Sequence, residues 1–387
     1  MPIPIESRRG RAALMAAHCV GMVDLVALPI WVGTLIAHYR LDPQKAGMLA
    51  TLFLAGMVVA SVLVAPRLQR LSGRAVAALG FGAAAAGFLA ASTAADFSTL
   101  AILHLAAGLA NGAALSVTHG TIARSARPHR LFAIASISLG VFGVAFLAVT
   151  PQVIGKIGGT GLFLAFAAVM AAAAAISLLA FPSPDTAGRI ALPTAPASPL
   201  PASVWLGIAG IACMTIVQAM TFSFLERVGS DRGFERQAIN AMLIALGLVS
   251  LLPPALAALL EKRWNARTVL LLGPVLQAIL CALIMTATTF PAYAVAASVF
   301  PGVMIFVHTF AFGLIAKLDP SGRALAGTPA MIMTGSAIGP LFGGSLVKAF
   351  GYGSLGIAAA ILATIAVFCF SRLPASTPPG VSQGALA

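Results

Sequence analysis

Charged residues are scarce in this sequence. Only 9% of the 387 residues are Asp, Glu, Lys or Arg, and only ten residues are acidic, whereas 60% are hydrophobic. A water-soluble chain with this composition would expose a large apolar surface to water. The scarcity of charge therefore excludes a soluble globular protein and predicts that lipid is the solvent around most of the chain.

Motifs of common enzymes and metal sites are also missing. The four cysteines (Cys19, Cys213, Cys281 and Cys369) have no CxxC spacing and lie within apolar runs, which indicates small packing residues rather than disulfides or a zinc site. The sequence has no Walker-type phosphate loop, no HExxH, and no GxSxG in a strand and helix context. It thus predicts no enzyme, no cofactor and no ATP-driven pump.

Apolar runs of roughly 20 residues fill most of the chain, and each is long enough to cross a hydrocarbon core about 30 Å thick as a helix. The runs are continuously apolar, unlike the alternating strands of membrane barrels. The sequence therefore predicts an all-α membrane protein with twelve spans joined mostly by short loops. The predicted spans are residues 12–37, 46–66, 75–95, 98–123, 131–153, 160–181, 204–226, 237–260, 268–289, 292–316, 324–347 and 354–371.

Basic residues are unevenly distributed between alternate loops. With the N-terminus in the cytoplasm, 16 of the 23 Lys and Arg residues fall on the cytoplasmic side and 7 on the other. This bias predicts that both termini are cytoplasmic, in a bacterial inner membrane. The anionic inner leaflet then accounts for the net charge of +13, so no nucleic-acid partner is expected. The first apolar run is too long for a cleaved signal peptide, and we expect it to be retained.

A proline-rich stretch divides the sequence into two similar parts. It contains six prolines among Ser, Thr and Ala, which is typical of a linker, here a cytoplasmic one. Basic loop residues recur on both sides at an offset of 193, as with Arg74 and Arg267. Such duplication is common in secondary transporters. The predicted parts are an N-terminal six-helix half (1–181), the linker (182–203), and a C-terminal six-helix half with a short tail (204–387).

The loop after the second span carries a family resemblance that extends over essentially the whole chain. Residues 66–74 look like the GxLaDRxGRR signature of the major facilitator superfamily, with Gln69 where an acid is expected and one extra residue before the glycine. The counterpart at residues 261–267 keeps an acid. The chain therefore resembles this superfamily. The resemblance implies roles in conformational change for Arg70, Arg74, Glu261, Arg263 and Arg267.

Two helix motifs add to the resemblance. In the fourth span, His104 begins a run similar to RxxxGxxxG, with histidine in place of arginine. In the eleventh span, Gly335, Gly339 and Pro340 belong to a run similar to the GxxxGPxxGG pattern of the superfamily's exporters. Glycines of this kind let helices approach closely. The resemblance implies a monomer of two pseudo-symmetric six-helix bundles, in a branch like the drug and metabolite exporters, that works by alternating access.

Few ionisable residues lie within the predicted spans, where each is energetically costly. Asp24 is the only acid well inside a span, and four histidines accompany it: His18, His104, His119 and His308. All five lie on spans that the resemblance implies to surround a central cavity, so we expect a shared, water-filled polar site. The remaining candidates for lining this cavity are Asn111, Gln218, Thr221 and Met304.

Asp24 is the predicted proton-coupling residue, and His104 is the second candidate. A carboxyl in apolar surroundings binds a proton more readily than it does in water, and an imidazole titrates near neutral pH. Alternating access would change the surroundings of these groups and so load and release protons. The structural alternative is that each group only forms a hydrogen bond between helices.

Secondary active transport of a small organic solute is the predicted function, with proton-coupled efflux favoured. One alternative is proton-coupled uptake of an organic anion, with His104 or His308 as the countercharge. Another is transport of copper or a similar soft metal by His18, Met22, Met304 and His308, because sulfur and imidazole ligands suit Cu(I). A third is a non-transporting membrane sensor or scaffold. The lack of a sizeable soluble domain argues against a sensor, and the intramembrane polar residues argue against a scaffold.

Overall fold

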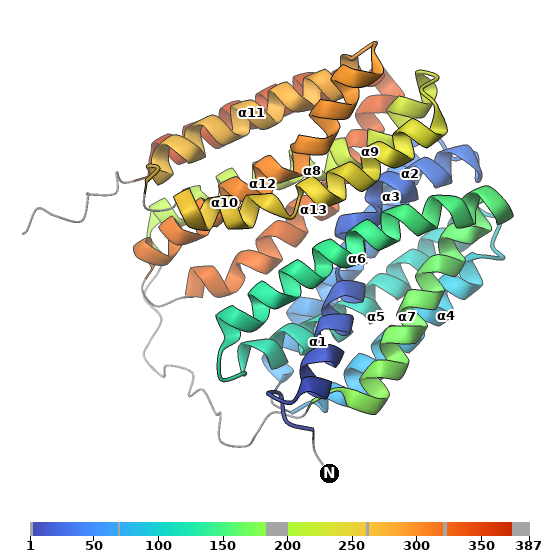
Figure 1. Ribbon diagram of the computed structural model, residues 1–387, viewed down its shortest axis with the longest axis vertical. Coiled ribbons are helices and arrows are strands. Elements are labelled where there is room, and N and C mark those ends of the chain that lie inside the picture. Colours follow the sequence, from blue (N-terminus) through green and yellow to red (C-terminus); the bar gives the residue numbers. More distant parts are fainter. Residues whose placement is uncertain (1–2, 69, 183–199, 261–262, 320–322, 374–387) are drawn as a thin grey trace, which may run out of the picture.

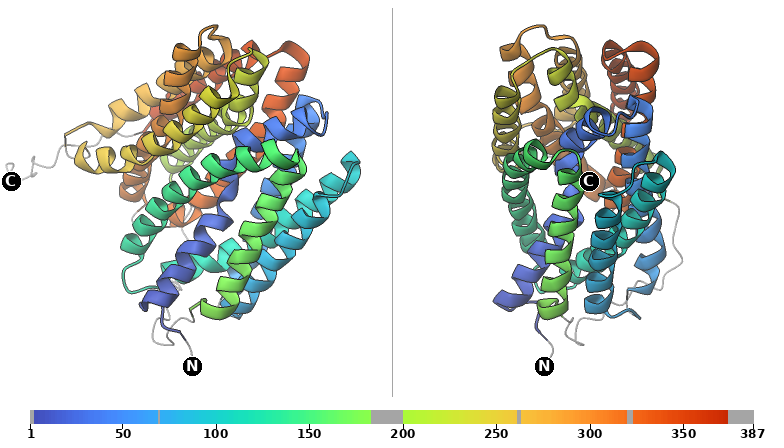
Figure 2. Two further views of the ribbon diagram at one scale, coloured as in Figure 1. Left: turned by 45° about the vertical axis from the view of Figure 1, so that its right-hand side comes forward. Right: turned by 90° about the vertical axis from the view of Figure 1, so that its right-hand side faces the viewer.

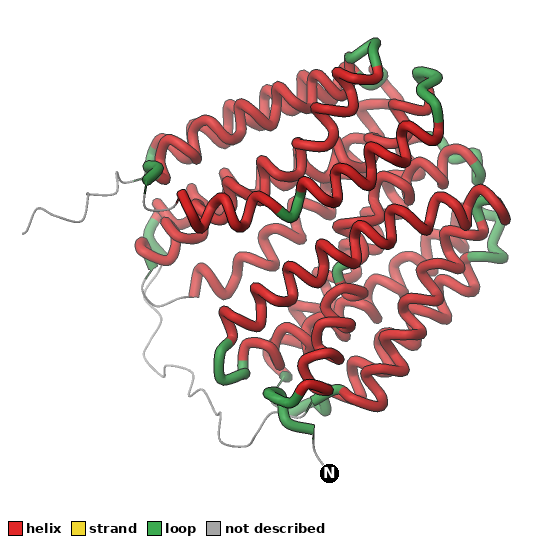
Figure 3. The backbone as a smooth tube through the Cα atoms, viewed as in Figure 1, coloured by secondary structure: helices red, strands yellow, loops and turns green. Residues whose placement is uncertain are grey.

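The chain is helical throughout its described part. The computed structural model describes residues 3–373 except 69, 183–199, 261–262 and 320–322. Within these limits it contains α-helices, one short 3-10 turn and no strand (Figure 3), so the all-helical prediction is confirmed. The elements are α1 Arg8–Gly21, α2 Val23–Ala37, α3 Pro43–Val64, η1 Ala65–Arg67, α4 Gly73–Ala91, α5 Phe97–Ala123, α6 Pro128–Ile157, α7 Thr160–Ala180, α8 Ala202–Asp231, α9 Arg236–Val249, α10 Leu252–Leu260, α11 Ala266–Thr286, α12 Phe290–Leu318, α13 Arg323–Phe350 and α14 Gly353–Ser371.

The helix bounds follow the predicted spans closely. Among the described residues, eleven helical segments are long and apolar enough to cross a membrane. The predicted eleventh span coincides with α13. Three predicted features fall outside the described residues: Glu261, most of the linker, and the tail from residue 374 onward.

The predicted first span is two helices rather than one. α1 ends at Gly21 and α2 begins at Val23, because Met22 has φ −107° and ψ 23°, outside the helical region. The Leu25 N–H, which would reach the Gly21 carbonyl in a continuous helix, instead donates to Met22 at 3.2 Å. The Asn111 side chain of α5 donates to the freed Gly21 carbonyl at 3.0 Å. A polar group from a neighbouring helix thus stabilises the break.

The predicted eighth span is also broken. α9 ends at Val249 and α10 begins at Leu252, with Ser250 and Leu251 between them in a turn. The next residues, Pro253 and Pro254, have no N–H with which to continue the hydrogen-bond ladder of α9. Consecutive prolines therefore end one helix and start the next, as their preference for the first helical turn would favour.

The helices form two groups that meet along three helix pairs. The N-terminal group, α1–α7, contains the contacts of α5 with α3 and α4, and of α4 with α7. The C-terminal group, α8–α14, contains the contacts of α13 with α8, and of α11 with α12 and α14. Between the groups, α2 packs on α8, α3 on α13 and α6 on α9 (Figure 1). Figure 2 shows the blue-to-green N-terminal group beside the yellow-to-red C-terminal group.

Glycines bring helices into close contact in both groups. A β-carbon at Gly112 in α5 would lie 2.5 Å from the Met57 Cα of α3, and one at Gly108 would strike the Phe53 carbonyl oxygen. In α13, a β-carbon at Gly339 would lie 2.8 Å from the backbone nitrogen of Met220 in α8. In a membrane, where lipid gives no hydrophobic force between helices, this close backbone packing holds each group together.

Candidate functional site

The break between α1 and α2 places Asp24 in the first turn of α2. Its side chain is 3% exposed, and the buried Oδ1 atom accepts no hydrogen bond from any described residue. The helix N-terminus provides favourable electrostatics for a carboxylate, although it leaves this atom unpaired. A buried carboxyl oxygen without a partner is costly and rare in folded proteins. Asp24 is therefore positioned to gain or lose a proton or to bind a cationic group.

Asn111 supports this break through its amide nitrogen. Its amide nitrogen donates to the Gly21 carbonyl and also approaches the Met57 sulfur at 3.5 Å, and its side chain is fully buried. The prediction that Asn111 lines a solute cavity stays a prediction, and its Oδ1 has no hydrogen-bond partner among the described residues. The freed carbonyl of the broken helix must be satisfied inside the protein, and an amide on the adjacent helix does so.

His18 and His119 form a pair between α1 and α5. His18 Nδ1 lies 3.0 Å from His119 Nε2, which is hydrogen-bond distance, so one ring donates to the other. The His119 ring also meets the edge of Phe132 in α6, with ring centroids 5.6 Å apart. His18 is 6% exposed and His119 is half-buried. The sequence placed both in the predicted cavity, and the structure brings these two together.

His104 lies inside the N-terminal group, among aromatic rings. The Trp31 indole N–H of α2 donates to its Nε2 at 3.3 Å, and its Nδ1 lies 2.6 Å from the Leu100 carbonyl. Because an indole nitrogen only donates and a carbonyl only accepts, this arrangement requires a neutral imidazole with its proton on Nδ1. Phe88 and Phe163 pack edge-on against the ring, which is fully buried. This geometry gives His104 a structural role between α2 and α5.

A pair of amide side chains lies between α8 and α11 of the C-terminal group. Gln277 of α11 donates to the Gln218 side chain of α8 and to the Met214 carbonyl, both at 3.2 Å. Thr221 donates to the Cys281 sulfur at 3.1 Å and is fully buried. Of the two predicted lining residues on α8, half-buried Gln218 keeps some exposure, whereas Thr221 is enclosed between α8 and α11. A buried hydroxyl needs a hydrogen-bond partner, and the Cys281 sulfur provides one for Thr221 between the two helices.

His308 and Met304 belong to α12 and interact with each other through the backbone. His308 Nδ1 lies 2.8 Å from the Met304 carbonyl, and the ring packs against Phe312 with centroids 5.1 Å apart. Met304 packs in the apolar core of the C-terminal group. Among the described residues, no group of three or more His, Cys, Asp and Glu side chains is arranged to hold a metal ion. His18, the other imidazole of the copper alternative, is instead paired with His119.

Two of the motif arginines hold helix ends. Arg74 donates through Nε and Nη2 to the Phe181 carbonyl, just past the end of α7, at 3.3 and 3.2 Å. Arg267 donates to the Ser371 carbonyl at the end of α14, at 2.9 Å. The last carbonyls of a helix lack helical partners, and a cation there also opposes the helix dipole. Their neighbours Arg70 and Arg263 are exposed.

The eleventh-span motif lies where α13 contacts two other helices. Gly335 and Gly339 face α8, and the Pro340 carbonyl faces Gly47 of α3. Next to Pro340, the Leu341 N–H donates to Thr51 of α3 at 3.1 Å. The motif therefore joins α13 to its own group on one face and to the N-terminal group on the other.

Sequence reasoning missed two contacts between the groups. Thr51 donates to the Ala337 carbonyl of α13 at 2.6 Å, which makes it a polar bridge between the groups. Glu226 of α8 lies directly against Gly33 of α2, where a β-carbon would strike its carboxylate. The sequence alone does not show that Gly33 faces Glu226, because the two residues are about 190 positions apart and only the packing of α2 on α8 brings them together.

Several known proteins share this architecture. The profile of the Major Facilitator Superfamily matches residues 13–321. Among solved structures, the chain is similar to a D-xylose–proton symporter (TM-score 0.73, 14% identity, covering 96% of this chain and 99% of that one). It is also similar to the nucleoside transporter NupG (TM-score 0.74, 16% identity, covering 94% of this chain and 98% of that one). A third similar structure is a bacterial homolog of the human lysosomal transporter Spinster in an inward-facing and unoccupied conformation (TM-score 0.70, 14% identity, covering 95% of this chain and 95% of that one). No curated protein matches the sequence.

Proposed function

The chain belongs to the major facilitator superfamily, and from this premise we propose that it moves a small organic solute across a membrane by proton-coupled alternating access. One observation carries the proton assignment: Asp24 is a buried carboxyl whose Oδ1 accepts no hydrogen bond from the described residues, at a break in a membrane-spanning helix. A permanently charged or permanently paired acid could not serve as a proton carrier. The Asp24 carboxyl is buried, and one of its two oxygens has no hydrogen-bond partner among the described residues.

The position of Asp24 supports coupling to the movement of the two groups. α2, which begins beside Asp24, is the helix of the first span that packs on α8 of the C-terminal group. A change in the contact between α2 and α8 would alter the surroundings of the carboxyl and its access to water. The proton affinity of a buried acid depends strongly on both. His104, held neutral by Trp31 and Leu100, has no comparable freedom, so we assign coupling to Asp24 alone.

The contacts between the groups support a carrier closed on one side. Asp42 pairs with Lys348 at 3.2 Å, and Gly344 of α13 approaches the Pro43 carbonyl of α3. These contacts lie at the helix ends opposite the N-terminus. With the termini cytoplasmic, as the loop charges predict, this state is closed to the outside of a bacterial inner membrane. We infer efflux from the exporter-like motif of α13, which lies at this same contact.

The proposal is tested with purified protein in liposomes under an imposed pH gradient. The assay follows a panel of fluorescent cationic, neutral and anionic organic solutes, together with a pH-sensitive dye. We expect one solute class to accumulate against its gradient while protons move in the opposite direction. Asp24→Asn should reduce gradient-driven accumulation of the solute by at least about tenfold, because the amide cannot carry a proton. Exchange of solute across the membrane should continue. Proton movement in the same direction as the solute would instead identify uptake.

The matched control is Asp96→Asn. Asp96 is an exposed N-cap of α5 whose side chain accepts from the Thr99 N–H, and asparagine caps helices equally well. This variant removes the same charge and should transport normally. Accumulation by Asp24→Asn at the parent level would show that Asp24 is not the proton site. Solute binding without flux in any vesicle would contradict transport itself and favour a sensor.

A further inference from the structure

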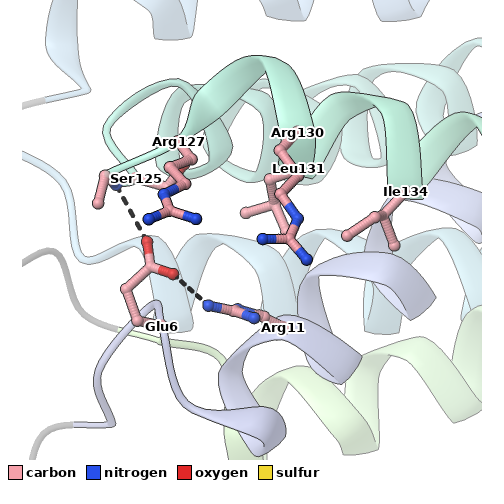
Figure 4. Close-up of a pocket in the computed structure, with 8 residues that line it drawn as sticks. Glu6, Arg11, Ser125, Arg127, Arg130, Leu131 and Ile134 are labelled. Atoms are coloured by element: carbon pink, nitrogen blue, oxygen red, sulfur yellow. Dashed lines mark hydrogen bonds and ion pairs between the residues drawn. The ribbon is translucent and has the colours of Figure 1, made fainter.

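A cavity of about 370 Å³, lined by charged and apolar side chains, lies at the end of the bundle that carries the N-terminus. It is partly open, and it is lined by the segment preceding α1, the first turn of α1, the turn that joins α5 to α6, and the start of α6 (Figure 4). Arg11 enters it from α1, and Arg127 and Arg130 enter it from the start of α6. None of the proposed transport residues contributes to it. This cavity is therefore a separate feature of the molecule.

The charges in this cavity do not balance. Glu6 is the one acid among the lining residues, and its carboxylate already accepts from the Arg11 guanidinium at 2.5 Å and from the Ala126 N–H at 3.0 Å. These bonds, the Arg11 bond first, hold the pKa of Glu6 below its usual range. Across the described chain, neither Arg127 nor Arg130 forms an ion pair. The charge of Arg127 also acts on Glu6, so three guanidinium groups share one carboxylate and an excess of positive charge is left for an anion.

A hydroxyl adds to this donor set. Ser125 lines the cavity, and its Oγ, turned away from the open space, is buried without a hydrogen-bond partner among the described residues. A shielded hydroxyl without a partner is unfavourable unless a ligand or water satisfies it. Guanidinium groups and hydroxyls together are the donors that recognise phosphate oxygens, because charged N–H groups form the strongest bonds to them.

The remaining wall of the cavity is apolar and continues into the membrane. Leu131 and Ile134 line the cavity on α6, and the segment from Arg130 to Ile157 is apolar enough to span a bilayer. Beyond the cavity, Ile137 and Val141 of the same helix are exposed by 63% and 60%. A ligand that fills this cavity would meet phosphate-binding groups first and a path of exposed aliphatic side chains next. That order matches a phospholipid lying along α6.

We propose that the cavity binds the phosphate group of an anionic phospholipid from the leaflet on the side of the N-terminus. Arg127 and Arg130 hold the phosphate oxygens, the Ser125 hydroxyl joins them by rotation of its side chain, and an acyl chain lies along α6. Glu6 serves a positioning role, because its bonds to Arg11 and Ala126 fasten the start of α1 to the α5–α6 turn. A lipid in the cavity ties the first turns of α1 and α6 together, and α6 is one of the helices that contacts the C-terminal group.

The test measures lipid binding by the full chain in a neutral detergent, using native mass spectrometry. Phosphatidylglycerol and phosphatidylcholine are titrated separately, and glycerol phosphate forms a third arm. We expect saturable binding of phosphatidylglycerol and little of phosphatidylcholine. The double variant R127Q/R130Q should bind phosphatidylglycerol roughly 25-fold more weakly, from two surface arginine contributions.

The control is R8Q/R9Q, which removes the same charge from exposed positions in the first turn of α1 that do not line the cavity. It should bind phosphatidylglycerol as the parent does. Equal affinity in the parent and in R127Q/R130Q, with both proteins showing the same thermal unfolding midpoint, would overturn the site. Equal weakening in R8Q/R9Q would overturn it as well, because general surface charge would then suffice. Binding of glycerol phosphate without phosphatidylglycerol would overturn the lipid assignment.

Discussion

The N-terminal and C-terminal groups share a scaffold but differ in their polar interior. Arg74 and Arg267, which are 193 residues apart, each hold the last carbonyls of the sixth and twelfth spans. Glycines allow close packing in both groups. The interior chemistry is not repeated: three imidazoles and a carboxyl with one unpaired oxygen lie in the first group, and one imidazole, His308, and an amide pair, Gln218 and Gln277, lie in the second.

This difference distinguishes residues that both groups need for helix packing from polar residues that are needed at particular positions in one group only. Helix ends and close helix contacts are needed wherever helices pack in lipid, so both groups retain them. Polar side chains within spans are needed only where they satisfy a broken backbone or act on a solute. Asp24 and Glu226 illustrate the second kind. Glu226 lies at the α2–α8 contact and Asp24 in the first turn of α2, and the offset of 193 residues places Gly33 and Val217 at the corresponding positions, so neither acid is repeated. The comparison can be tested group by group.

Close glycine packing should matter most, and equally in both groups. Gly108→Ala and Gly339→Ala should each destabilise the protein by about 3 kcal/mol, because the new methyl group meets the backbone of a neighbouring helix, which cannot move aside. The measurement is the thermal unfolding midpoint in detergent. The controls are Gly155→Ala and Gly313→Ala, where no atom lies within 4 Å of the added carbon. A large loss in only one group would contradict the shared scaffold.

The histidines should behave differently in the two groups. His104→Leu should destabilise the protein by about 1–2 kcal/mol, because it leaves the buried Trp31 N–H without an acceptor. His308→Leu should change stability by less than about 0.5 kcal/mol, because the bond that it removes is to a carbonyl of its own helix. Chemical denaturation followed by tryptophan fluorescence measures both. Equal losses of stability in the two variants would show that His104 and His308 contribute equally to stability and would contradict this difference.

The arginine caps should give the smallest effects of the three and should sharpen the comparison of the helix ends. Arg74→Gln should cost about 1 kcal/mol and Arg267→Gln somewhat less, because Arg74 forms two bonds to its carbonyl and Arg267 forms one. Hydrogen exchange at the ends of α7 and α14 reports the local loss. The exposed neighbours provide the controls Arg70→Gln and Arg263→Gln, and no change in exchange is expected from either. Equal hydrogen exchange rates at these helix ends in all four variants would show that Arg74 and Arg267 do not cap the helices.

Several features were predictable from the sequence because they depend on neighbouring residues alone. Apolar runs of the right length predicted the helices, and the bounds of α5, α7 and α14 lie within about one residue of the prediction. The repeated basic loops pointed to Arg74 and Arg267, although their role as helix caps was not foreseen. The breaks at Met22 and Ser250 were missed. The Pro253 and Pro254 pair offered a signal for the second break, whereas the first depends on Asn111 from another helix.

Composition and periodicity determined by themselves that this chain is an all-helical membrane protein of many spans, because the cost of exposing backbone and charge to lipid leaves few other structures. Tertiary structure alone decided the partner of each polar side chain. It placed His104 beside Trp31, His18 beside His119, and Glu226 against Gly33, and it left one oxygen of Asp24 unpaired. The physical reason is that a polar group in a span takes the nearest complementary group on an adjacent helix, and helix adjacency arises from packing between distant segments.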